Sequence, residues 1–208
     1  MAVYARSTTV RGDAAAVDDG IAMVREDVMP ALQEMEGWVG LSMLVDRTYG
    51  TAIVTSAWDS ERALVRSRDR VAALRDRAAE QLGGAAEVEE WEIALLHRER
   101  MSGAGACSRV TWLKVHRYDI DHQVDVFRTR LLPQLEVLPG FCSASLLVNR
   151  ETGRATSTVT YESRGALERS RPEARRLREE ATRIVGAEIH DVAELELALA
   201  HLRVPERV

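Results

Sequence analysis

The spacing of apolar and polar residues predicts strands and helices in one order that occurs twice along the chain. Runs rich in β-branched and aromatic residues predict strands in the first half at residues 3–10, 38–45, 51–58 and 87–96. Apolar residues at helical spacing predict a helix that begins at Val17 and a second helix over residues 60–82, capped by Ser60. The first half therefore has the order strand, helix, strand, strand, helix, strand.

The second half predicts the same order. Its strands are expected at residues 109–116, 141–148, 155–161 and 192–199. One helix is expected around Phe127, and another over residues 163–184, capped by Ser163. The first helix of each half contains a proline, Pro30 or Pro133, and we expect the helix to bend or restart there.

An alignment of the chain with itself explains this repetition. Residues 37–64 align with residues 140–167 without a gap, and identical residues occur at Gly37/Gly140, Ser42/Ser145, Leu44/Leu147, Val45/Val148, Arg47/Arg150, Gly50/Gly153, Ala52/Ala155, Thr55/Thr158, Ser60/Ser163, Ala63/Ala166 and Leu64/Leu167. Such self-similarity is the signature of a tandem repeat. The sequence predicts one repeat over residues 1–98, a linker over residues 99–107 and a second repeat over residues 108–208.

The order β-α-β-β-α-β is typical of the ferredoxin-like α+β arrangement, an antiparallel sheet with both helices on one face. The other face of such a sheet needs cover. Two sheets packed face to face within one chain supply it, so we predict an intramolecular α/β barrel. This chain is expected to be a monomer with an internal pseudo-twofold axis or a homodimer.

Composition excludes several classes of partner. The net charge of −5 over 208 residues argues against nucleic-acid binding, which favours a basic face. No apolar run reaches the length that spans a bilayer, and the N-terminus lacks the features of a signal peptide. The two cysteines, Cys107 and Cys142, fit reduced thiols in the cytoplasm. A single lysine among many arginines is typical of a GC-rich bacterial genome.

Two motifs carry a resemblance to a known family. One is the turn and strand Pro-Gly-Phe-Cys-Ser-Ala-Ser-Leu-Leu from Pro139, with a weaker copy from Glu36. The other is the strand-to-helix junction Ala-Trp-Asp-Ser-Glu-Arg-Ala-Leu from Ala57, with a copy from Thr160. Through these motifs each half resembles the dimeric α/β-barrel superfamily, most closely the antibiotic biosynthesis monooxygenase (ABM) domain. The resemblance covers nearly the whole chain.

The resemblance implies a pocket between the sheet and its helices in each half. Such pockets hold aromatic polyketides, quinols or haem, and quinol-type members oxidise their substrate with dioxygen and no cofactor. The family's junction tryptophan corresponds to Trp58 and, in the second half, to Tyr161. The first-strand asparagine of haem-degrading members falls at or near Arg6 and Thr111, so it is absent. These four residues are the expected pocket residues, and no cofactor is expected.

Structural roles compete with these assignments. Trp58 and Tyr161 also suit core packing, and Arg6 suits either a solvent face or an anion site. The Arg- and Glu-rich run from Arg164 to Arg183 suits a solvated helix face with ion pairs. The histidines have no spacing that indicates a metal site, and haem degradation is disfavoured because the helices over residues 60–82 and 163–185 lack histidine.

Two functions therefore remain open. The first is a cofactor-independent monooxygenase that acts on a small aromatic, quinol or polyketide-like molecule. The alternative is a non-catalytic barrel that binds a small molecule or has a structural role. The sequence assigns no catalytic residue. A wide pocket with convergent polar groups favours the enzyme, and a pocket filled by side chains favours the alternative.

Overall fold

Contacts divide the chain into two units. The structure, a computed structural model, describes residues 2–202, 204 and 206. Unit 1 comprises residues 1–91 and 197–204, and unit 2 comprises residues 92–196 and 205–208. Two long strands, β4 (Ala86–Arg98) and β8 (Glu188–Leu202), are therefore divided between the units.

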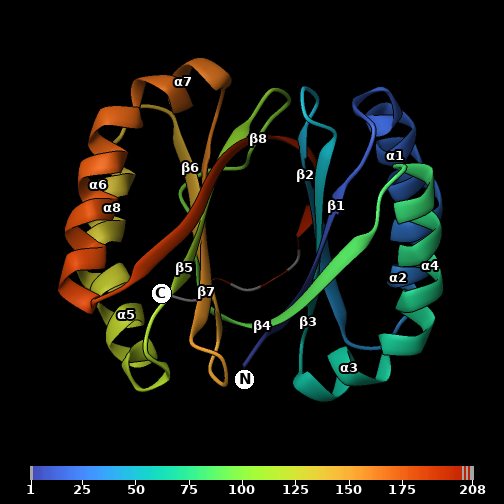
Figure 1. Cartoon of the computed structure of the whole chain (residues 1–208), viewed down its shortest axis with the longest axis horizontal. Helices are drawn as coiled ribbons and strands as arrows, with labels where there is room; N and C mark the ends of the chain where they lie inside the picture. Colours follow the sequence, from blue (N-terminus) through green and yellow to red (C-terminus); the bar gives the residue numbers. More distant parts are fainter. Residues whose placement is uncertain (1, 203, 205, 207–208) are drawn as a thin grey trace. The chain divides into compact units, whose positions relative to one another are not determined.

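Unit 1 contains one sheet covered by helices. Its remaining elements are the strands β1 (Tyr4–Arg11), β2 (Trp38–Asp46) and β3 (Thr51–Trp58) and the helices α1 (Val17–Met23), α2 (Met29–Gln33), α3 (Glu61–Arg66) and α4 (Arg68–Gln81). Strand β3 pairs antiparallel with both β1 and β2. Helices α1, α2 and α4 lie on one face of these strands (Figure 1).

Unit 2 repeats this arrangement. Its elements are the strands β5 (Cys107–Lys114), β6 (Phe141–Asn149) and β7 (Arg154–Tyr161) and the helices α5 (Ile120–Val126), α6 (Leu132–Glu136), α7 (Arg164–Arg169) and α8 (Arg171–Val185). Strand β7 pairs antiparallel with β5 and β6. The last residues of β3 and β7 have matching partners, since Trp58 faces Tyr4 and Tyr161 faces Cys107.

The eight strands form a closed barrel in the hydrogen-bonded order β1-β3-β2-β8-β5-β7-β6-β4. Each strand pair with a described register is antiparallel. The predicted α+β class and the antiparallel α/β barrel are confirmed. Among the described residues, no helix has both the length and the apolar character needed to cross a membrane.

Short polar interactions define the ends of the elements. Ser60 Oγ accepts a hydrogen bond from the Ala63 N–H, and Ser163 Oγ accepts one from the Ala166 N–H, each at 3.2 Å. Both predicted N-caps are therefore confirmed. In the β2–β3 hairpin, Asp46 Oδ1 accepts the N–H groups of Thr48 and Tyr49. Asn149 Oδ1 accepts the corresponding pair, Glu151 N–H and Thr152 N–H, in the β6–β7 hairpin.

The first helix of each unit continues through its proline but contains a π-helical turn just before it. A π-helical turn, Val24–Val28, separates α1 from α2, and Phe127–Leu131 separates α5 from α6. Pro30 and Pro133 follow these turns, in the first residues of α2 and α6. Proline lacks an N–H and its ring clashes with the preceding helical turn, so it is best placed where a new helical segment begins.

Two sequence predictions about elements were wrong. The helix expected over residues 60–82 ends at Ser67 and restarts as α4, and its counterpart restarts after Ser170. At each break the serine Oγ donates to the carbonyl three residues earlier, Leu64 O or Leu167 O, at 2.7 Å. These side chains compete with the regular backbone ladder. The last strand also begins at Glu188, earlier than the expected residue 192.

The tight turn at Gly140 generates a stability prediction. Gly140 has a φ of 79°, and an added Cβ would lie 2.5 Å from Ala166 Cβ. Gly186 also has a positive φ, 64°, but an added Cβ meets nothing within 4 Å. We expect Gly186→Ala to lower the free energy of unfolding by about 1 kcal/mol, the cost of a left-handed alanine. Gly140→Ala adds a clash and is expected to cost about 3 kcal/mol.

Urea denaturation of both variants measures this difference directly. Equal losses in the two variants would show that the contact with Ala166 relaxes without cost.

Candidate functional site

The aromatic residues expected at the strand-to-helix junctions are core residues. Trp58 is fully buried, and its Nε1 donates to Ser56 Oγ at 3.2 Å. Tyr161 is fully buried in unit 2, and the Arg109 guanidinium carbon lies 5.8 Å from its ring centroid. The Tyr161 hydroxyl has no hydrogen-bond partner among the described residues. Neither aromatic side chain lines a cavity between sheet and helices.

Arg6 lies on β1 with its side chain almost completely buried and fully engaged. Its Nε and Nη2 donate to Glu90 Oε1 at 3.0 and 2.8 Å. Nη1 donates to Ser67 Oγ at 2.9 Å, and Nη2 also donates to Leu64 O at 2.7 Å. The guanidinium thus joins β1, the break between α3 and α4, and β4. The anion that it holds is a carboxylate of the same chain.

Unit 2 contains the same set of contacts, built on Arg109. We call each buried arginine, together with its glutamate, serine and carbonyl partners, the clamp. Its Nε and Nη2 donate to Glu194 Oε1 at 3.2 and 2.8 Å. Nη1 donates to Ser170 Oγ and Nη2 to Leu167 O. Thr111 is the expected pocket residue on the first strand of unit 2, but the residue that makes the contacts equivalent to those of Arg6 is Arg109. The ungapped alignment of the two halves, extended back to the first strands, already matches Arg6 with Arg109.

The clamp carboxylates are held in their charged form. Burial raises the pKa of Glu90, but hydrogen bonds from Arg68 and Arg6 lower it by more, so the net pKa lies below its usual value. The same balance, with Arg171 and Arg109 as donors, holds the pKa of Glu194 below its usual value. Each carboxylate therefore bridges two arginines.

A cavity of about 40 Å³ lies between sheet and helices in each unit. In unit 1 it is lined mainly by aliphatic residues from β1, β3, α2 and α4, with Arg6, Thr8, Ser56 and Arg75 as polar members. In unit 2 it is lined by residues from β5, β7, α5 and α8, together with Phe127 and Leu131 from the π-helical turn. Of the expected pocket residues, Arg6 lines the first cavity and Thr111 the second.

The two cavities differ in their polar groups. Gly20, Val54, Arg75 and Ala79 of unit 1 correspond to Gln123, Ser157, Arg178 and Thr182 of unit 2. In unit 1, Arg75 pairs with Asp76 at 2.9 Å. In unit 2, Gln123 Oε1 and Arg178 Nε are buried without a hydrogen-bond partner among the described residues. The cavity of unit 2 therefore contains polar groups with unused hydrogen-bonding capacity, and sequence reasoning missed both of them.

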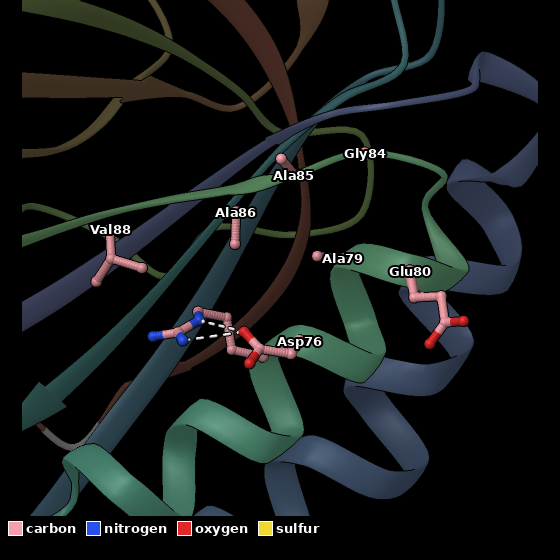
Figure 2. Close-up of a pocket in the computed structure, with 8 residues that line it drawn as sticks. Asp76, Ala79, Glu80, Gly84, Ala85, Ala86 and Val88 are labelled. Carbon is pink, nitrogen blue, oxygen red and sulfur yellow. Dashed lines mark hydrogen bonds and ion pairs between the residues drawn. The ribbon is translucent and has the colours of Figure 1, made fainter.

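The wider hollows on the surface are less organised. A groove of about 530 Å³ in unit 1 runs between α4 and β4. Figure 2 shows Asp76 and Glu80 on its helix side and Ala86 and Val88 on its strand side. Arg75 and Asp76 neutralise one another there, which leaves Glu80 as the remaining charged residue of the groove. Within the described part of the chain, no group of His, Cys, Asp and Glu side chains could hold a metal ion.

Solved structures define the class of protein to which this fold belongs. A candidate monooxygenase from Lactobacillus acidophilus matches 98% of this chain and 97% of its own, with a TM-score of 0.70 and 10% identity. An anthrone oxidase-like protein matches 99% of this chain and 95% of its own, with a TM-score of 0.67 and 14% identity. A heme-degrading enzyme from Listeria monocytogenes matches 93% of this chain and 98% of its own, with a TM-score of 0.53 and 12% identity. The fold is therefore that of the ABM-type ferredoxin-like proteins.

Sequence relatives define the family. The uncharacterized protein Rv2557 of Mycobacterium tuberculosis is 52% identical over 206 residues, which cover 99% of this chain and 92% of the relative. The uncharacterized protein Rv2558 of the same organism is 54% identical over 207 residues, covering 99% and 88%. The chain belongs to the family of these two mycobacterial proteins. No family model matches it.

The clamp generates a prediction about acid stability. A carboxylate whose pKa is depressed by folding stabilises the protein fully above its unfolded pKa, roughly 4.3, and loses this contribution as the pH falls through the folded pKa. We expect the free energy of unfolding of Glu194→Gln to fall less than that of the wild type when the pH is lowered below about 4.3. The matched control is Glu87→Gln, since Glu87 pairs with Arg11 on the exposed surface.

The measurement is the free energy of unfolding of the wild type and both variants across the acid range. Parallel acid profiles for Glu194→Gln and the wild type would rule out the clamp as a source of acid sensitivity.

Proposed function

We propose that the protein binds a small molecule in the sheet–helix cavity of unit 2. One observation carries the proposal: Gln123 and Arg178 line this cavity, and their Oε1 and Nε atoms are buried without a hydrogen-bond partner among the described residues. A buried polar atom without a partner costs free energy, and native proteins rarely leave such an atom unexplained. A bound molecule that hydrogen-bonds to both groups removes the cost. At the corresponding positions of unit 1, Gly20 has no polar side chain and Arg75 is paired with Asp76, so neither position needs a ligand to satisfy it.

The size of the cavity limits the ligand. A water molecule needs roughly 10–15 Å³, so about 40 Å³ accommodates about three waters or a few heavy atoms. Sites for drug-sized molecules commonly enclose roughly 300–1,000 Å³. The volume supports a short ligand, or the head group of a longer one, and it favours non-catalytic binding over oxidation of a polycyclic substrate. Among the residues described around either cavity there is no histidine that could bind haem iron.

A second candidate is cofactor-independent oxidation of a small quinol by dioxygen. The fold neighbours described as a candidate monooxygenase and an anthrone oxidase-like protein support it. The buried hydroxyl of Tyr161, which has no hydrogen-bond partner among the described residues, is the phenol proposed for proton transfer with a quinol hydroxyl. Tyr161 does not line the cavity, so the quinol must reach beyond the present cavity to meet it. A quinol ring is larger than the present cavity, so this function requires the side chains around Phe127 to move.

Filling the cavity tests the binding site. Ala181 lines the cavity of unit 2, and Ala78 has the matching position in unit 1. A ligand at about 100 times its dissociation constant stabilises the native state by about 2.7 kcal/mol, which raises the melting temperature measurably. In a panel of glycolate, catechol, hydroquinone, anthrone and haemin, we expect stabilisation by one or more of the small compounds. Ala181→Leu is expected to abolish it, and Ala78→Leu to leave it unchanged.

Circular dichroism establishes that both leucine variants are folded before the comparison. The proposal fails if no small compound stabilises the wild type, or if the two leucine variants lose the stabilisation equally.

Oxygen consumption tests the second candidate. With hydroquinone as the substrate, Tyr161→Phe is expected to reduce the rate by about a hundredfold, the contribution of a positioned proton-transfer group. Trp58→Phe at the matching position in unit 1 is the control and is expected to retain the wild-type rate. A wild-type protein that consumes no oxygen with catechol or hydroquinone would reject oxidation and leave the binding proposal intact.

A further inference from the structure

Arg178 differs from three other arginines of α8, namely Arg171, Arg175 and Arg176. Arg171 binds Glu194, Arg175 binds Glu179, and Arg176 binds Glu173 and Glu180. Within the described residues Arg178 has no carboxylate partner, and its Nε is buried without a hydrogen bond. A guanidinium is charged at every ordinary pH, so this positive charge cannot be removed by deprotonation.

The surroundings make the charge at Arg178 unfavourable in the unliganded protein. Burial lowers the pKa of Arg178, and the positive charges of Arg109 and Arg175 lower it further. The negative charges of Glu179 and Glu194 offset only part of this effect, and the net pKa of Arg178 stays below its usual value. An anion beside Arg178 would supply a further counter-charge to this half-buried side chain.

The remaining walls of the cavity define the shape and polarity of that anion. Gln123 Oε1 accepts hydrogen bonds, and the described part of the chain offers it no donor, so it favours a ligand with a hydroxyl group. The hydroxyl-bearing residues Thr111, Ser157 and Thr182 also line the cavity. The other walls are apolar, with Leu113, Phe127 and Val185 among them, and they suit a short hydrocarbon part.

From this arrangement we infer that the cavity of unit 2 is a binding site for a short 2-hydroxycarboxylate. The Arg178 Nε–H donates to the carboxylate, and the ligand hydroxyl donates to Gln123 Oε1. A doubly charged phosphate fits less well, because one arginine neutralises only one charge and the walls are largely apolar. This inference rests on the proposed function, since it names the ligand class of the same cavity.

Calorimetric titration of the full chain tests the charge requirement without any substitution. The probes are glycolate and lactate, with glycolamide and lactamide as uncharged counterparts of nearly the same shape. A hydrogen bond between charged partners contributes about tenfold or more in affinity over a neutral one, so we expect the amides to bind at least about tenfold more weakly. Equal affinities for glycolate and glycolamide would overturn the inference.

Two variants test the named side chains. Arg178→Gln is expected to weaken glycolate binding by about tenfold or more, whereas Arg75→Gln, at the matching position of unit 1, leaves it unchanged. Gln123→Leu is expected to weaken glycolate binding but not acetate binding, because acetate has no hydroxyl. Acetate that binds the wild type as tightly as glycolate, or glycolate that is insensitive to Arg178→Gln, would contradict the assignment.

The outcomes separate this inference from the proposed function. If the amides and catechol bind as tightly as the acids and Ala181→Leu abolishes all binding, the cavity is a ligand site without an anion requirement. If none of these compounds binds to the wild type, the inference and the proposed function both fail. Melting temperatures of the variants without ligand confirm that each is folded.

Discussion

The buried arginine on the first strand of each unit is the interaction on which the surrounding structure depends. Arg6 and Arg109 satisfy a carbonyl and a serine hydroxyl at the break between two helices, and both reach a glutamate on the last strand. Removing a guanidinium from water is costly, and only a complete set of acceptors offsets that cost. The helix break, the strand position and the glutamate must therefore occur together.

This constraint also limits where ligand chemistry can occur. The guanidinium of Arg6 has its acceptors within the chain, so it has little capacity left for a substrate. Within the described residues, Gln123 and Arg178 of unit 2 have buried polar atoms without a hydrogen-bond partner, and both residues line the cavity of that unit. Glycine and a paired arginine occupy the equivalent places in unit 1. The two units thus share a scaffold and differ at the cavity, which is the pattern expected when one of them binds a ligand.

The features that could be predicted from the sequence are those that depend on neighbouring residues. Caps at Ser60 and Ser163 and the hairpin residue Asp46 act through neighbouring backbone groups, so residue type and spacing suffice. The hydrogen bond from Arg6 to Ser67 at the helix break joins residues sixty-one positions apart, and no local pattern reveals this contact. The position of Arg178 in the cavity could not be predicted from the sequence for a different reason. It lies in an Arg- and Glu-rich helix whose other residues form the expected solvated ion pairs, such as Arg175 with Glu179.

Fold and cavity place different limits on function. The ABM-type fold is shared at about 10% identity with proteins described as a candidate monooxygenase and as a heme-degrading enzyme, so the fold does not choose between chemistries. The cavity is more selective, since a large ring must displace packed side chains such as Phe127, and interiors at close-packed density resist such displacement. A short anion would need no displacement and would add a counter-charge beside Arg178, whose pKa is lowered mainly by burial. Volume and charge therefore favour the same ligand, although they depend on different residues.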